Sequence, residues 1–174
     1  MKFFTPELFV RFNSADDEGW EAAIRAYRAH LEGLRDQMPS QVRKLAGLCL
    51  HDAEVLACDQ PIEPLFSFRP FEPFPIWSGL AILSIRQGDE ISSLIYVLWD
   101  SVSHYPAGEG WPFSKARRHW LYDEVDVSPN HPGMFVHRVL LSDGTTMEIP
   151  FLSALIHSIS LIDQPEVDAP KQIA

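Results

Sequence analysis

The sequence predicts an α+β protein in which N-terminal helices pack on an antiparallel sheet of five or six strands built from hairpins. The first 49 residues place hydrophobic side chains at helical spacing. Residues 79–162 contain short apolar runs separated by glycine-containing turns, a pattern that is typical of hairpins. Because the helices precede the strands and do not alternate with them, the chain fits an α+β arrangement better than a βαβ fold.

The N-terminal part predicts three helices. Thr5 can cap a short helix that begins at Pro6, because proline is well tolerated in the first turn. A second helix carries one continuous apolar stripe, formed by Trp20, Ile24, Tyr27, Leu31, Leu34 and Met38. Pro39 ends this helix, since the residue before a proline is pushed out of the helical region. Ser40 then starts a third helix, whose apolar face extends to Cys49, which we expect to be buried.

Residues 50–78 form a connector that is rich in proline and phenylalanine. Residues 50–58 fit a strand or a continued helix, and residues 61–75 contain prolines that favour an extended segment outside any sheet. We therefore expect one domain over residues 1–174, with a helical part (1–49), the connector (50–78), an antiparallel part (79–162) and a frayed tail (163–174).

Two hairpins define the antiparallel part. A turn at residues 88–89 places Ile82 opposite Ile95. Residues 100–116 follow as a long loop, and residues 118–127 alternate as a strand. The second hairpin turns at residues 143–144, where Asp-Gly predicts a two-residue loop that sets Leu140 opposite Met147, with Val136 on the same face. Residues 153–162 fit a last strand or a short helix.

The composition excludes several classes of protein. With 24 acidic residues against 14 lysines and arginines, the net charge is −10, which disfavours nucleic acid as a partner and would attract a protein with a basic surface. Acidity that only keeps the protein soluble is the alternative. No apolar stretch is long enough to span a membrane, and the absence of a secretory signal predicts a cytoplasmic location. Cys49 and Cys58 form no disulfide framework or CxxC pair.

Common catalytic motifs are missing from the sequence. It contains no phosphate-binding GxxxxGK[ST] loop, no GxSxG nucleophile elbow, no HExxH zinc motif and no dinucleotide-binding GxGxxG. We therefore expect no cofactor, and a non-enzymatic protein is favoured over an enzyme.

The adjacent pair His51-Asp52 is the strongest sign of metal chemistry. Helical metal-dependent phosphohydrolases combine such a pair with an upstream histidine and a downstream aspartate, and His30 and Asp100 have the corresponding order in this chain. The alternative is structural: Asp52 caps a turn, and His51 forms a local hydrogen bond. Helices do not follow the pair in the expected fold, which disfavours the metal site.

A second cluster lies in the strand at residues 118–127. Trp120, Tyr122 and Glu124 occupy alternate positions and would project from one face of a regular strand. Two large rings beside a carboxylate suit a protein-recognition surface. They equally suit a sheet face that is covered by the N-terminal helices.

Three segments together resemble an uncharacterised bacterial family of unknown function. They are MKFFTPEL at residues 1–8, LHDAEV at residues 50–55 and WLYDE at residues 120–124. The resemblance implies a small cytosolic bacterial protein and transfers no catalytic or binding residue. It directs attention to His51, Asp52 and Glu124.

These observations favour a small acidic, non-enzymatic protein-binding module. One concrete form is an immunity-type protein that neutralises a basic toxin. The candidate binding residues are His51, Asp52, Trp120, Tyr122 and Glu124. Two alternatives stay open: a metal-dependent hydrolase that uses His51 and Asp52, and a domain that binds a small ligand between the helices and the sheet. The sequence leaves the oligomeric state open.

Overall fold

The computed structural model describes residues 1–15, 17–62, 79–107, 111–113, 118–129, 131 and 133–160. It contains the helices α1 (Pro6–Phe12), α2 (Asp17–Leu34) and α3 (Ser40–Ala46), with a 3-10 turn η1 (Arg35–Gln37) before α3. The strands are β1 (Glu54–Ile62), β2 (Leu80–Gln87), β3 (Glu90–Leu98), β4 (Ser103–Tyr105), β5 (Trp120–Val127), β6 (Phe135–Leu141) and β7 (Thr146–Ser160). The predicted α+β class is confirmed. The prediction of a loop over residues 100–116 was wrong in one respect, because the strand β4 lies within this range.

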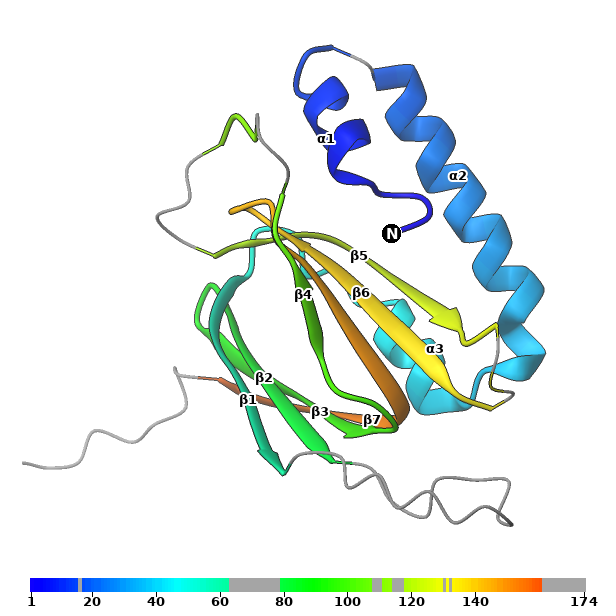
Figure 1. Cartoon of the computed structure of the whole chain (residues 1–174), viewed down its shortest axis with the longest axis vertical. Helices are drawn as coiled ribbons and strands as arrows, with labels where there is room; N and C mark the ends of the chain where they lie inside the picture. The colour runs from blue at the N-terminus through cyan, green and yellow to red at the C-terminus, as the bar shows by residue number, and fades with distance from the viewer. Residues whose placement is uncertain are drawn as a thin grey trace, which may run out of the picture.

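The strands form one antiparallel sheet in the order β1-β2-β3-β7-β6-β5, and β4 also pairs with β7 (Figure 1). The sheet curls until its two ends meet. Glu54 at the start of β1 bridges to His119, and the Trp120 N–H donates to the Ala53 carbonyl at 2.8 Å. One side of every strand therefore faces the inside of the curl, and the other side faces outward.

The inside of the curl is filled by a hydrophobic core. Inward-facing residues of the strands pack together with α3, whose Val42 and Leu45 are each only 1% exposed. Trp120, Tyr96 and Phe151 are the largest rings in this core, and all three are fully buried. The third helix therefore contributes to the interior of the curled sheet.

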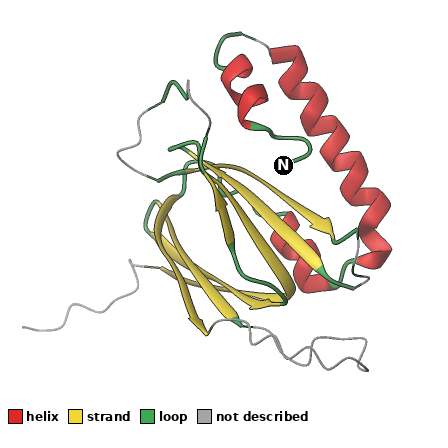
Figure 2. Cartoon of the chain, in the orientation of Figure 1, coloured by secondary structure: helices red, strands yellow, loops and turns green. Residues whose placement is uncertain are grey.

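A second cluster joins α1 and α2 to outward-facing residues of β5 and β6. Figure 2 shows the two N-terminal helices, in red, on one side of the strands. Its buried members are Phe4, Leu8, Phe9, Trp20, Tyr27, Leu121 and Leu140. The expected cap is present, because Thr5 Oγ1 accepts the Leu8 N–H at 3.2 Å. The chain thus has one core inside the curl and a second outside it.

Several local predictions are settled by the described backbone. The hairpin of β2 and β3 is confirmed, with Ile82 opposite Ile95. Residues 54–62 and 146–160 are both strands, which decides between strand and helix at these two places. The expected burial of Cys49 was wrong: α3 ends at Ala46, and the thiol lies exposed beyond it. The Pro/Phe-rich stretch 63–78 and the tail after residue 160 lie outside the described residues.

The register of the second hairpin differs from the prediction by one residue. Val139, not Leu140, lies opposite Met147. The loop has three residues, because the Leu141 N–H donates to the Thr145 carbonyl and Gly144 takes a positive φ of 83°. A one-residue slip exchanges the two faces of a strand, so Val136 faces outward and His137 faces into the core.

The loop between β6 and β7 requires a glycine at position 144 for two reasons, and a substitution there tests both. We expect Gly144→Ala to destabilise the fold by about 2–4 kcal/mol, because its φ is left-handed and an added Cβ would lie 2.4 Å from the Ala107 Cβ. Gly88→Ala is the matched control: its φ is +59°, but nothing lies within 4 Å, so it should lose only about 1 kcal/mol. Urea denaturation measures both values, and equal losses would contradict the close approach at Gly144.

Candidate functional site

The five predicted site residues lie around β5, but not on one surface. β5 has an irregular register between Trp120 and Tyr122, which pair with the consecutive residues Leu141 and Leu140. The extra residue, Leu121, turns Trp120 to the inside of the curl, while Tyr122 and Glu124 stay outside. The expectation that the three side chains project together was therefore wrong for Trp120.

Trp120 belongs to a chain of buried polar contacts inside the curl. Its indole N–H donates to Asp123 Oδ1 at 2.9 Å, and Asp123 Oδ2 lies 3.0 Å from His137 Nε2. The other ring nitrogen of His137 lies 2.8 Å from the Tyr96 hydroxyl. When Nε2 of His137 donates to the Asp123 carboxylate, Nδ1 is left to accept a hydrogen bond from the Tyr96 hydroxyl. Every polar group in this chain is satisfied, which stabilises a single arrangement of the core.

Sequence reasoning missed this polar chain. His137 reaches Tyr96 only because of the one-residue register of the second hairpin, and Asp123 faces inward only because of the irregularity at Leu121. Neither feature has a signal in the sequence beyond the Asp-Gly turn itself. Tyr96 and His137 are out of reach of a substrate, because both are 0% exposed.

His51 and Asp52 form a tight turn before β1. The Ala53 N–H donates to the Leu50 carbonyl at 3.0 Å, and Asp52 has a left-handed φ of 66°, which aspartate tolerates better than most residues. His51 Nδ1 lies 2.8 Å from Asp52 Oδ2, and the imidazole packs against Tyr122 with ring centroids 5.0 Å apart. This is the local role that was the alternative to metal binding. Among the described residues, no group of three or more His, Cys, Asp and Glu side chains could hold a metal ion.

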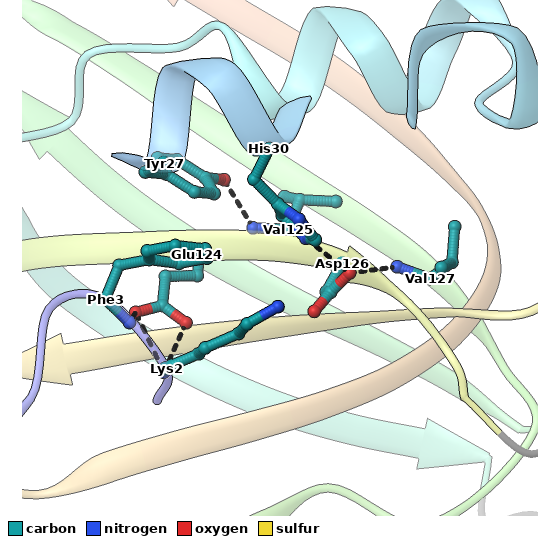
Figure 3. A network of polar contacts seen from close by, with 8 residues as sticks. All are labelled: Lys2, Phe3, Tyr27, His30, Glu124, Val125, Asp126 and Val127. Atoms are coloured by element: carbon teal, nitrogen blue, oxygen red, sulfur yellow. Dashed lines mark hydrogen bonds and ion pairs between the residues drawn. The ribbon is translucent and has the colours of Figure 1, made fainter. Parts of the chain in front are cut away.

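Glu124 binds the N-terminal segment of the chain (Figure 3). Its Oε1 accepts the N–H groups of Phe3 and Phe4, each at 2.6 Å, and its Oε2 accepts that of Lys2 at 2.8 Å. The carboxylate is only 1% exposed. Its charge is therefore compensated by successive backbone amides, which fix the start of the chain against β5.

The next two residues of the same strand, Val125 and Asp126, hold α2 (Figure 3). The Val125 N–H donates to the Tyr27 hydroxyl oxygen at 2.6 Å. His30 Nε2 lies 2.9 Å from Asp126 Oδ1, and the same oxygen accepts the Val127 N–H at 2.9 Å. Consecutive residues of β5 therefore bind the N-terminal segment and α2 through polar groups.

A hollow of about 550 Å³ opens beside these contacts, lined by Met1, Lys2, His30, Asp126, Val127, Pro129 and Arg138. A His-Asp pair at a hollow can accept a proton, but no serine, threonine or cysteine is among the described residues that line this one. Arg138 already pairs with Glu148 at 2.7 Å. The hollow is wide and open to solvent, unlike the pockets that enclose most of the surface of a small ligand.

A different surface lies on the outer side of β2, β3 and the second half of β7, away from α1 and α2 (Figure 1). We call it the recognition face and define it by seven outward-facing aliphatic residues. These are Leu80, Ile82, Ile91, Ile95, Val97, Leu155 and Ile159. Leu155 is 59% exposed and Ile159 is 51% exposed, while the others are half-buried.

Comparison with known proteins adds no assignment: no protein-family model matches the chain, and no curated protein matches it. The resemblance to an uncharacterised bacterial family therefore stays a prediction. Within the described part of the chain, no helix is long and apolar enough to cross a membrane.

The contacts of Glu124 lead to a prediction on stability. Glu124→Gln should cost about 2–3 kcal/mol, because the amide loses the charge and turns a donor toward backbone donors. Hydrogen exchange at Lys2, Phe3 and Phe4 should accelerate at the same time. Glu21→Gln on the exposed side of α2 is the control and should change stability by less than about 0.5 kcal/mol. Equal effects of the two substitutions would contradict the anchoring role of Glu124.

The two buried tyrosines, Tyr27 and Tyr96, predict that the protein is less stable at alkaline pH. Burial, with the charge of Asp123 adding to it, raises the pKa of both Tyr27 and Tyr96. A raised pKa means that the stabilising contribution of each phenol is complete below about pH 10, the value for an unfolded tyrosine, and is lost as the pH rises further. The free energy of unfolding should therefore fall above about pH 10, and more gently in Tyr96→Phe. Identical pH slopes in the two proteins would contradict this assignment.

Proposed function

We propose that this protein is a non-enzymatic binding module that recognises a protein partner through the recognition face. The observation that carries the proposal is the exposure of two large aliphatic side chains on one strand, Leu155 (59%) and Ile159 (51%). Contiguous apolar surface rimmed by polar residues is typical of protein-interaction sites.

The recognition face is continuous across three strands. Ile82 lies opposite Ile95, and Ile95 lies opposite Leu155, so these side chains form a row across the sheet. Ile91 lies opposite Ile159 in a second row. Neighbouring side chains in such rows are close enough to form one contact surface.

The charges around this face support a partner with a basic surface. Asp59 on β1 lies opposite Ile82 and is exposed, and Asp89 and Glu90 are exposed at the turn between β2 and β3. Arg86 is the basic residue of β2, and it pairs with Glu54. An apolar centre with an acidic rim suits a partner that has an apolar centre and a rim of lysine or arginine, and the net charge of −10 would speed their association. An immunity-type protein that blocks a basic toxin is one form of this function.

In this proposal the predicted binding residues around β5 stabilise the fold and do not contact the partner. The helices α1 and α2 act as a permanent cover of β5 and β6, held by Glu124 and Tyr27. Tyr122 packs under that cover, where its ring lies 4.3 Å from that of Trp20. This leaves the recognition face as the larger apolar surface for a partner, in a protein that acts in the cytoplasm without nucleic acid.

A photo-crosslinking residue at position 82 tests the proposal in the source cells. We expect one predominant protein partner, whose crosslinking falls several-fold in Asp59→Lys because a rim charge controls the association rate. Glu21→Lys is the matched control, since it makes the same charge change on an exposed site of α2, and it should leave crosslinking unchanged. Equal loss in both variants, or no protein crosslinked at position 82, would contradict the recognition face.

A further inference from the structure

The second half of β7 has one paired edge and one open edge. β3 pairs with it as far as Ser160, whereas the pairing of β6 begins at Phe151 and runs back toward residue 146. Among the described residues, no strand pairs with the other edge of residues 152–159. An open edge presents unpaired backbone N–H and C=O groups that can pair with another strand.

This edge lacks the proline and charged side chains by which many proteins prevent edge-to-edge pairing. Residues 151–160 contain no proline and no Asp, Glu, Lys or Arg. The chain otherwise carries a net charge of −10, and β1, the outer strand at one end of the order, has the exposed Asp59. Two copies that met along β1 would bring carboxylates together, whereas two copies that meet along β7 would not.

We infer that two copies of this chain pair antiparallel along residues 155–159 of β7, on a two-fold axis at His157, and form one sheet that continues across both. The inference goes beyond the proposed function and does not depend on it.

With the two-fold axis at His157, the exposed aliphatic side chains of the two β7 strands face each other. In an antiparallel pair, a two-fold axis at His157 sets Leu155 opposite Ile159 of the second copy, and this contact occurs twice by symmetry. Leu155 and Ile159 are the exposed large aliphatic residues of β7. Moving the axis to residue 155 or 156 would instead set Leu155 against another Leu155 or against His157, so Ile159 would lose its apolar partner.

The dimer has two structural consequences. Because the same edge of each copy is used, the contact closes on itself and stops at two chains. The recognition faces of both copies then meet at the axis and form one larger apolar surface. A contact of about five residues from each chain belongs to the small, weak class of interfaces, so we expect a dissociation constant in roughly the micromolar range.

Analytical ultracentrifugation of the purified chain over a concentration series tests the dimer without any partner. We expect a monomer–dimer equilibrium that shifts at least tenfold toward monomer in His157→Lys, which sets two ammonium groups against each other at the axis. Ser84→Lys is the matched control: it adds the same charge to the outer side of β2, away from the open edge, and should leave the equilibrium unchanged. Circular dichroism and thermal unfolding establish that both variants are folded.

Cysteine crosslinking tests the register itself, in a Cys49→Ser background because that thiol is exposed and free. Residues opposite each other in an antiparallel pair have Cα atoms about 4.5–5.5 Å apart, which suits a disulfide, so His157→Cys should form a covalent dimer on mild oxidation. Ser153→Cys is the control, since its two copies would lie about 26 Å apart.

Three results would overturn the inference. They are a chain that stays monomeric at high micromolar concentration, a His157→Lys variant that dimerises normally, and a Ser153→Cys variant that crosslinks as fast as the His157→Cys variant. None of these results bears on crosslinking at position 82, so the two proposals fail separately.

Discussion

The buried carboxylate of Glu124 is the contact on which the arrangement of this protein depends. A carboxylate that is 1% exposed requires compensation, and the N–H groups of Lys2, Phe3 and Phe4 supply it in place of a cation. These bonds fix the start of the chain on β5, and Phe4 then packs against Trp20 and Tyr27 of α2. The outer side of β5 and β6 is therefore occupied by the protein itself. The recognition face is what this arrangement leaves open.

The curl of the sheet creates the second constraint. Because β1 meets the start of β5, the sheet encloses its own core, and polar side chains that point inward must pair with one another. Tyr96, His137, Asp123 and Trp120 do so in a continuous chain. Such a chain favours one register over its neighbours, since a slip of one residue would leave each of these groups buried without a partner.

The sequence predicted the features that depend on local patterns. The cap at Thr5 and the pairing of Ile82 with Ile95 both follow from short-range signals, namely proline at the first helical position and a two-residue glycine turn. The Asp-Gly turn at residues 143–144 was recognised, but two- and three-residue loops share this dipeptide, so the register was wrong by one residue.

The candidate site depended on features that a linear pattern does not contain. The irregularity at Leu121 separates Trp120 from Tyr122, although a regular strand would place them on one side. The partners of Glu124 are backbone amides more than a hundred residues away in the chain, and backbone amides leave no signature in sequence. The open edge of β7 is likewise a property of strand order, which local periodicity does not determine.

In the described part of the chain, α1 and α2 cover the outer side of β5 and β6, whereas the outer side of β2, β3 and β7 is left exposed. Hydroxyl-radical oxidation of the purified protein at low concentration, read out by mass spectrometry, tests this arrangement most directly. The account predicts rapid oxidation of Leu155 and Ile159, and protection of Trp20 and Tyr122 beyond the difference in their intrinsic reactivities. Rapid oxidation of Trp20 and Tyr122 with protection of Leu155 and Ile159 would contradict it.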